Sequence, residues 1–167
     1  MHSSLANFEY ILPEIKNLSR DCQDGEREME QTFKKLTDKT QKERWNYVTY
    51  LEKFGRPALE YLHSALEDED KWVRYMAADA LGNIGDVRSI DRLVRLLQDK
   101  DQDVRFATAY ALGNIGHVSA SGALVETCNK DNGYVRVAAE EALAKLNSGG
   151  QDEIRHHEGQ LVAAMGK

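Results

Sequence analysis

Residues 72–85 read WVRYMAADALGNIG, and residues 103–116 read DVRFATAYALGNIG. The two stretches match position by position at a spacing of 31 residues, and a weaker third copy keeps the same register. The arginine of each copy follows the previous one by 31 positions, at Arg74, Arg105 and Arg136, so no gap is needed. Self-similarity at a fixed period of this length is typical of a solenoid of stacked helix pairs. The sequence therefore predicts an all-α repeat protein.

Each 31-residue unit is predicted to form two antiparallel helices, and the pattern is clearest over residues 86–116. The first helix carries one apolar stripe at helical spacing, formed by Ile90, Leu93, Leu96 and Leu97. A polar turn follows at residues 99–102, and we expect Asp103 to cap the second helix. Gly116 is expected to end that helix in the left-handed conformation.

The repeat period divides the chain into a cap, an array and a tail. The three predicted parts are an N-terminal helical cap (1–40), an array of repeats (41–147) and a C-terminal polar tail (148–167). The array consists of a half unit (41–55) and three repeats (57–85, 88–116 and 119–147). The half unit depends on the match of Arg44-Trp45 to Arg74-Tyr75 at a spacing of 30 residues. Because an end unit of a solenoid exposes an apolar face, we expect the N-terminal helices to cover it.

The composition is that of a folded globular protein. Apolar residues make up 41% and charged residues 30% of the 167 residues. No run of 18 apolar residues occurs, and the first residues lack the basic-then-apolar pattern of a signal peptide, so no membrane association is expected. The two cysteines, Cys22 and Cys128, form no CxxC motif. We therefore expect a cytoplasmic protein that does not depend on disulfides.

Arginines recur at the repeat spacing and raise the question of nucleic-acid binding. They are Arg44, Arg74, Arg105 and Arg136. Residues 57–147 nonetheless hold 15 acidic and 10 basic residues, a balance that opposes binding to phosphates. Asp68 and Asp99 also recur at 31 residues. We therefore expect a ladder in which each arginine pairs with acids and helix ends of its own or the neighbouring unit, and nucleic acid is not an expected partner.

The strings WVRYMAADALGNIGD and DVRFATAYALGNIGH resemble the HEAT-like repeats of the phycobilin-lyase type. The resemblance covers residues 57–147 and implies a right-handed superhelix of helix pairs. It implies little about activity, because similar repeats occur in bilin lyases, phycobilisome-degradation factors, iron-dependent hydroxylases and scaffolds. A bilin-lyase-like or tetrapyrrole-handling accessory subunit is one function that the resemblance implies.

One enzyme class with such repeats is the deoxyhypusine hydroxylase. A resemblance to it would require a His-Glu pair directly after the Val-Arg dipeptide of several repeats, where these side chains would bind two iron ions. Here those slots hold Tyr75-Met76, Phe106-Ala107 and Val137-Ala138. None of these side chains is a ligand for a hard metal. The motif His156-His157-Glu158 occurs once, in the predicted tail, and we interpret it as solvated chain. With no phosphate loop or nucleophile motif present either, we expect no catalytic residue, metal or cofactor.

The predicted second helices leave aromatic and acidic residues outside the core. This set, called the concave strip below, consists of Trp72, Tyr75, Asp79, Phe106, Tyr110, Tyr134 and Glu141. Spacings of three and four residues place the members from each helix on one face, and stacking of the repeats aligns these faces. Because second helices line the concave side of HEAT-type arrays, we expect the concave strip to bind an extended or helical protein segment with basic or apolar residues. In the other interpretation, Tyr75 and Phe106 pack between the repeats.

The sequence thus predicts a non-enzymatic interaction scaffold or adaptor that binds a protein partner on the concave face of a short repeat array. The bilin-lyase-like role is the alternative from a different class. The residues predict neither the identity of the partner nor the oligomeric state.

Overall fold

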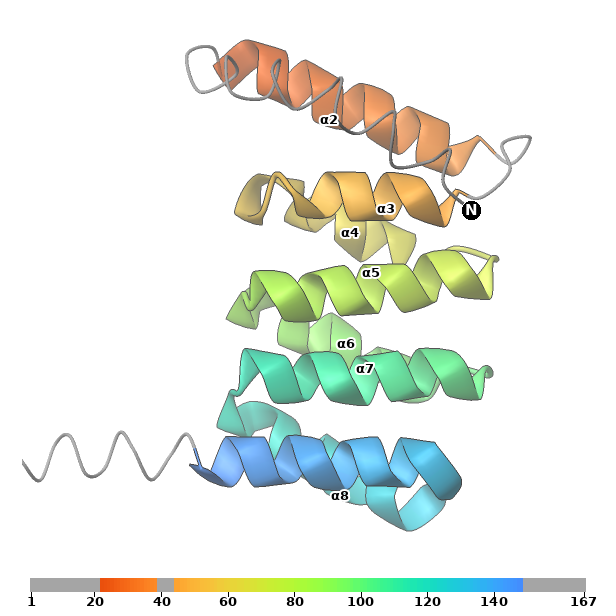
Figure 1. Cartoon of the computed structure of the whole chain (residues 1–167), viewed down its shortest axis with the longest axis vertical. Coiled ribbons are helices and arrows are strands. Elements are labelled where there is room, and N and C mark those ends of the chain that lie inside the picture. The colour runs from red at the N-terminus through yellow and green to blue at the C-terminus, as the bar shows by residue number, and fades with distance from the viewer. Residues whose placement is uncertain (1–21, 39–43, 149–167) are drawn as a thin grey trace, which may run out of the picture.

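The computed structural model describes residues 22–38 and 44–148, with side chains from residue 25 onward. Every regular element in these ranges is helical, which confirms the predicted all-α solenoid (Figure 1). Three predictions fall at least partly outside the described residues: the first half of the N-terminal cap, the polar tail beyond residue 148 and the His156-His157-Glu158 motif within it. The boundaries of the cap, half unit and repeats stay predictions. None of the described helices has the length and apolar character needed to cross a membrane.

In the three repeats, a shorter helix is followed by a longer one. In chain order the helices are α2 (Cys22–Thr37), α3 (Trp45–Glu52), α4 (Leu59–Ala65), α5 (Lys71–Ile84), α6 (Ile90–Leu96), α7 (Gln102–Ile115), α8 (Ser121–Lys130) and a last helix over residues 133–148. Short 3-10 turns lead into the first helix of each repeat, and these are η1 (Arg56–Ala58), η2 (Val87–Ser89) and η3 (Val118–Ala120).

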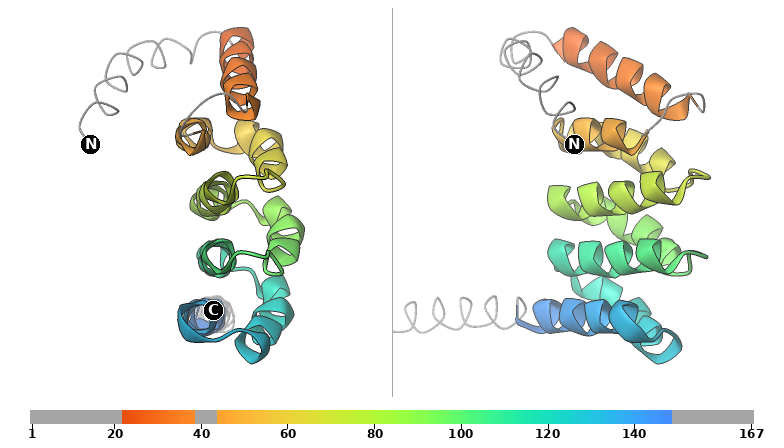
Figure 2. Two further views of the ribbon diagram at one scale, coloured as in Figure 1. Left: turned by 90° about the vertical axis from the view of Figure 1, so that its right-hand side faces the viewer. Right: turned by 45° about the vertical axis from the view of Figure 1, so that its right-hand side comes forward.

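The helices form two layers that run along the molecule (Figure 1, Figure 2). The inner layer contains α3, α5, α7 and the 133–148 helix, and the outer layer contains α4, α6 and α8 (Figure 2). The outer layer bows outward, so the inner layer lies on the concave side of a shallow curve. Helix α2 packs on α3 at the N-terminal end. The second helices of the repeats therefore line the concave side, as the sequence predicts.

Aspartates begin α5 and α7, and glycines end both helices. Asp101 is the N-cap of α7, because its carboxylate accepts a hydrogen bond from the backbone N–H of Asp103 at 3.0 Å. The prediction that Asp103 is the cap is wrong, since the helix has already begun at that residue and the Asp103 side chain is left for contacts with other repeats. Asp70 caps α5 in the same way. Gly85 and Gly116 end the two helices with φ of 70° and 71°, which confirms the left-handed cap predicted at Gly116.

Glycines let the inner-layer helices approach each other closely. A Cβ atom on Gly82 of α5 would lie 2.6 Å from the Cα atom of Ala111 in α7. A Cβ atom on Gly113 of α7 would lie 2.9 Å from the Cα atom of Ala142 in the last helix. Both contacts are to backbone atoms, so no change of side-chain rotamer can relieve them. The distance between neighbouring second helices therefore depends on the absence of a side chain at these two positions.

A buried arginine joins α5 to the turn of the next repeat. Arg74 donates from Nε and Nη2 to the two carboxylate oxygens of Asp99, at 2.7 and 2.9 Å. Its Nη1 donates to the carbonyl oxygens of Asp68 and Glu69 in the turn before α5. Both charged side chains are more than nine-tenths buried. Burial opposes ionisation of Asp99, but the bonds from Arg74 and from the Asp101 backbone N–H still hold its pKa below the ordinary range.

The same bidentate arrangement recurs along the array. Arg44 pairs with Asp68, and Arg105 pairs with Asp131. Arg44 also donates to the carbonyl oxygen of Leu36, and Arg105 donates to that of Asp99. This confirms the predicted arginine ladder for Arg44, Arg74 and Arg105. The acid that pairs with Arg105 lies 32 residues after Asp99 rather than 31, because α8 is longer than α6.

The last helix differs from the other second helices on its outward face. Arg136 occupies the ladder position but is exposed and donates to Glu140 of the same helix at 2.8 Å. Glu140 stands where α5 and α7 have the buried Ala78 and Ala109. Ala144 stands where those helices have the closely packed glycines, and it is exposed. The face that would receive another repeat is therefore charged and bulkier than the faces inside the array.

Replacement of Arg74 by Ala should lower the free energy of unfolding by about 3 kcal/mol, because it leaves the buried Asp99 carboxylate without its partner. Arg136→Ala is the matched control, since it removes an exposed pair within one helix that contributes roughly 0.3–0.5 kcal/mol. Urea unfolding followed by circular dichroism measures both values. Similar losses in the two variants would contradict a structural role for the ladder.

Replacement of Gly82 by Ala should destabilise the protein by about 2 kcal/mol, because the added Cβ overlaps the backbone of α7. Gly122→Ala provides the control, since a Cβ atom on this helical glycine meets no heavy atom within 4 Å. That variant should gain up to about 1 kcal/mol through the helix propensity of alanine. Thermal unfolding distinguishes the two, and a stabilised Gly82→Ala protein would show that the helices are farther apart than described.

Candidate functional site

The concave strip lies on three neighbouring helices of the inner layer (Figure 2). Its members are Trp72, Tyr75 and Asp79 on α5, Phe106 and Tyr110 on α7, and Tyr134 and Glu141 on the 133–148 helix. Four of the seven form two aromatic pairs near the N-terminal ends of these helices. The other three lie farther along the helices and form no ring contact with those pairs.

The first aromatic pair comes from one turn of α5. The rings of Trp72 and Tyr75 meet edge to face, with their centroids 6.0 Å apart. The ammonium group of Lys71 lies 4.8 Å from the centroid of the Trp72 ring. The same ammonium is 3.0 Å from Asp103 and 3.2 Å from Asp101, and the hydrogen bonds to these carboxylates raise its pKa. The Lys71 ammonium, which is held by two carboxylates of the next repeat, therefore helps to hold the Trp72 ring in place.

The second aromatic pair joins two repeats. The rings of Phe106 and Tyr134 meet edge to face, with centroids 5.5 Å apart. The Tyr134 hydroxyl donates to Asp103 Oδ1 at 2.7 Å, and this bond raises the pKa of the phenol to about 12. The bonds from Tyr134 and Lys71 in turn lower the pKa of Asp103. Asp103 thus connects α5, α7 and the last helix through its single carboxylate.

Tyr110 is covered by a cation from the next repeat. The ammonium group of Lys145 lies 4.5 Å from the centroid of the Tyr110 ring and donates to the side-chain oxygen of Asn114 at 2.9 Å. The geometry repeats the combination of ring and oxygen acceptors that holds Lys71. The strip therefore contains two cases in which an ammonium group binds over an aromatic ring.

Asp79 and Glu141 are the two acids of the strip, and the structure does not bring them together. They occupy equivalent positions two repeats apart. Asp79 is half-buried on α5, and burial raises its pKa while a hydrogen bond from Asn83 partly offsets the effect. Glu141 is exposed, and among the described residues no hydrogen bond or ion pair joins it to the rest of the strip.

The aromatic residues of the strip differ in how far they are buried. Tyr75 and Phe106 are half-buried and pack against the core, as the packing interpretation expects. Trp72, Tyr110 and Tyr134 are 50%, 42% and 41% exposed, so they remain accessible. The strip is therefore a surface in which packed rings contact exposed rings, within α5 for Tyr75 and Trp72 and between neighbouring helices for Phe106 and Tyr134.

Sequence reasoning missed three residues beside the strip. Trp45 of α3 is 36% exposed and stands at the position equivalent to Tyr75. The alignment of these two residues at a spacing of 30 could have predicted that Trp45 lies beside the strip. Lys71 and Lys145 have no repeat equivalent of the same charge. Their contacts cross from one repeat to the next, and periodicity alone carries no signal for such contacts.

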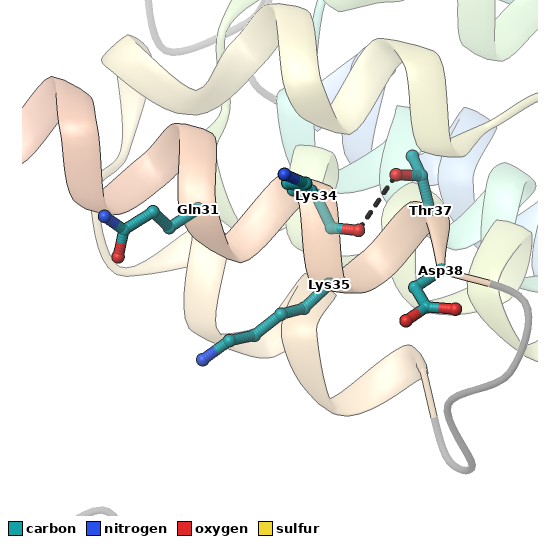
Figure 3. A pocket seen from close by; sticks show the side chains of 5 residues that line it. All are labelled: Gln31, Lys34, Lys35, Thr37 and Asp38. Carbon is teal, nitrogen blue, oxygen red and sulfur yellow. Dashed lines mark hydrogen bonds between the residues drawn. The ribbon is translucent and has the colours of Figure 1, made fainter.

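Two hollows elsewhere on the described surface have weaker features. One of about 590 Å³ is lined by Gln31, Lys34, Lys35, Thr37 and Asp38 at the end of α2. Its side chains splay along one helix end and do not converge on a common point (Figure 3). The other hollow, of about 190 Å³, lies between α4 and α6 and contains Arg92 and Arg95 together with acids. No group of three or more His, Cys, Asp or Glu side chains among the described residues is arranged to hold a metal ion.

The Tyr134 phenol should ionise near pH 12, well above an ordinary tyrosine, because its ionisation would place two negative charges together at Asp103. Asp103→Asn should return its titration toward pH 10. Since the folded pKa is the higher one, the contribution of this bond to stability is present below pH 10 and is lost as the pH rises through 12. Absorbance at phenolate wavelengths measures the titration, with Tyr134→Phe identifying the signal. Equal titration in the wild-type and Asp103→Asn proteins would rule out this bond.

The sequence and the structure are similar to those of known repeat proteins. The family model described as HEAT repeats matches residues 29–103 and 88–144. The structure of human deoxyhypusine hydroxylase in complex with glycerol is similar, with a TM-score of 0.73 and 25% identity over 82% of this chain and 49% of that one. The phycocyanin lyase complex of CpcE and CpcF from Nostoc sp. PCC7120 has a TM-score of 0.63 and 24% identity over 72% and 53% of the chains, which shows the fold alone.

An engineered protein has a TM-score of 0.54 and 26% identity over 72% of this chain and 63% of that one. The chain therefore spans about half the length of the first two structures. A search among curated proteins finds no match. Because the two matched segments together cover more than half of the sequence and the described helices form the expected layers, the chain belongs to the HEAT-repeat family.

Proposed function

We propose that the chain is a non-enzymatic scaffold that binds a segment of another protein along the concave strip. The observation that carries this proposal is the row of exposed rings, Trp72, Tyr110 and Tyr134, on three adjacent inner-layer helices. Aromatic side chains that are accessible yet held in place contribute strongly to protein interfaces, because they bury a large area at a small entropic cost. The contacts of Lys71, Asp103 and Lys145 hold these rings before a partner arrives.

The charge distribution favours a protein over a nucleic acid as the partner. The guanidinium groups of Arg44, Arg74 and Arg105 are engaged by carboxylates of the ladder and face the interior of the array. Neutralisation of phosphates would require clustered basic groups at the surface. The concave strip instead contributes two carboxylates of its own, from Asp79 and Glu141.

The repeat positions that follow each Val-Arg support the non-enzymatic assignment. Tyr75 and Phe106 at these positions pack against the core, and Val137 is half exposed on the last helix. The similarity to deoxyhypusine hydroxylase therefore extends to the helix pairs without supplying ligand side chains at these positions. The bilin-handling alternative depends on similarity at the level of the fold, which is shared by proteins of unrelated function.

We also propose a cytoplasmic location. Cys128 is a free thiol, and burial raises its pKa, which keeps it in the less reactive protonated form. A structure that depends on ion pairs and apolar packing rather than on disulfides suits a reducing compartment.

Binding of a partner should depend on the exposed rings. A partner that co-purifies with the full chain is first identified, and its dissociation constant is then measured with purified proteins. Trp72→Ala and Tyr110→Ala should each weaken binding by about tenfold or more, because exposed aromatic residues are frequent hot spots of interfaces. Each variant should keep a melting temperature close to that of the wild type.

Val87→Ala is the matched control, because Val87 is 55% exposed on η2, outside the strip. It should leave the dissociation constant unchanged. Unchanged binding in both strip variants would place the interface elsewhere on the molecule.

A further inference from the structure

We propose that the partner segment is basic and presents an arginine or lysine side chain to Asp79, with a second one reaching Glu141. This inference rests on the proposed function, because it specifies the chemistry of a segment bound along the same concave strip. Two observations support the proposal. Asp79 lies on the concave strip next to an aromatic side chain, and no lysine or arginine of the described residues pairs with it.

Asp79 differs from the aspartates that pair with a cation of the chain. Five aspartates in the turns or at the start of α7 lie within 3.2 Å of an arginine or lysine, and these are Asp68, Asp99, Asp101, Asp103 and Asp131. No lysine or arginine of the described residues pairs with Asp79, which accepts a hydrogen bond only from the neutral side chain of Asn83. Burial without a compensating cation raises the pKa of Asp79, so an approaching positive charge would stabilise its ionised form. A half-buried carboxylate on an exposed strip is thus left for a group from outside.

The Tyr75 ring beside Asp79 adds a second group that favours a cation. Tyr75 lies one turn before Asp79 on the same face of α5, and its own pKa is raised by burial and by the Asp79 charge, which shows that the two are close. Tyr110 holds the position equivalent to Asp79 on the neighbouring helix α7. A guanidinium or ammonium group at Asp79 would therefore lie beside the Tyr75 ring, with Tyr110 on the next helix of the strip.

The strip already uses this chemistry within the chain. Lys71 lies over the Trp72 ring with carboxylates at 3.0 and 3.2 Å, and Lys145 lies over the Tyr110 ring with an amide oxygen at 2.9 Å. Both contacts show rings oriented so that a positive charge can approach their faces. Asp79 with Tyr75 offers the same combination of ring and oxygen atoms without a cation of the chain upon it.

The repeat spacing sets the distance between the two basic residues of the partner. Asp79 and Glu141 are separated by two repeats, which at roughly 8–10 Å between helix axes is roughly 16–20 Å. An extended chain covers this distance in about six residues. The expected ligand is therefore an extended segment with basic residues at positions i and i+6. An apolar segment would leave Asp79 buried without a partner, and a nucleic acid would bring phosphates to both carboxylates.

Three fluorescein-labelled peptides test the proposal by fluorescence anisotropy with the full chain. They are 12 residues of Gly, Ser and Ala with arginine, citrulline or leucine at positions i and i+6, and citrulline keeps the shape of arginine without its charge. The arginine peptide should bind about tenfold more tightly than the other two. Equal binding of the arginine and citrulline peptides, tightest binding of the leucine peptide, or no saturable binding of any peptide would overturn the proposal.

Variants of the chain locate the effect. Asp79→Asn should weaken binding of the arginine peptide by about fivefold or more and remove the preference over citrulline, and Glu141→Gln should have a smaller effect of the same sign. Asp91→Asn removes an exposed acid on α6 of the outer layer and should leave binding unchanged. Retained preference in the Asp79→Asn protein, with an unchanged melting curve, would overturn the assignment of Asp79.

Binding of the natural partner to the same variants distinguishes an error in this inference from an error in the proposed function. If Trp72→Ala and Tyr110→Ala abolish partner binding while Asp79→Asn does not, the strip remains the interface and the basic segment is wrong. If none of the three variants changes partner binding, both are wrong.

Discussion

The structure depends on the pairing of Arg44, Arg74 and Arg105 with an aspartate of the following turn. Moving both charges out of water costs several kcal/mol, and the cost is offset only when the two groups meet in good geometry. Arg74 and Asp99 meet through two hydrogen bonds, and carbonyl oxygens of the preceding turn take up a further donor. A slip of one residue would leave a carboxylate buried without its partner. The pairing therefore fixes the register of stacking more than it adds net stability.

That register determines the surface of the inner layer. Because α5 and α7 approach closely at Gly82, the side chain of Lys71 can reach Asp103 in the next repeat, and Tyr134 reaches the same carboxylate from the repeat after it. These contacts hold the exposed rings in place before binding. The entropic cost of ordering these side chains is therefore largely incurred during folding, before a partner binds.

Much of the fold follows from the period of the sequence, and less of the candidate site does. The spacing of 31 residues predicts the helix pairs, the left-handed Gly116 and the pairing of Arg74 with a turn acid. It misses Asp131 because α8 continues to Lys130 and moves the acid by one position. It also misplaces the cap of α7, since Asp101 and Asp103 are chemically equal candidates and only the backbone decides between them. The contacts of Lys71 and Lys145 with aromatic rings cross repeat boundaries and depend on the distance between helices, which a one-dimensional pattern does not contain.

The outward face of the last helix limits how such an array can lengthen in evolution. A duplicated unit attached after residue 148 would meet the Glu140 carboxylate and the Ala144 methyl group where interior helices present Ala109 and Gly113. Duplication of an interior unit meets no such obstacle, because both of its faces are already shaped for neighbours. Longer relatives of this protein are therefore expected to gain units between interior faces of this kind rather than against a face like that of the 133–148 helix.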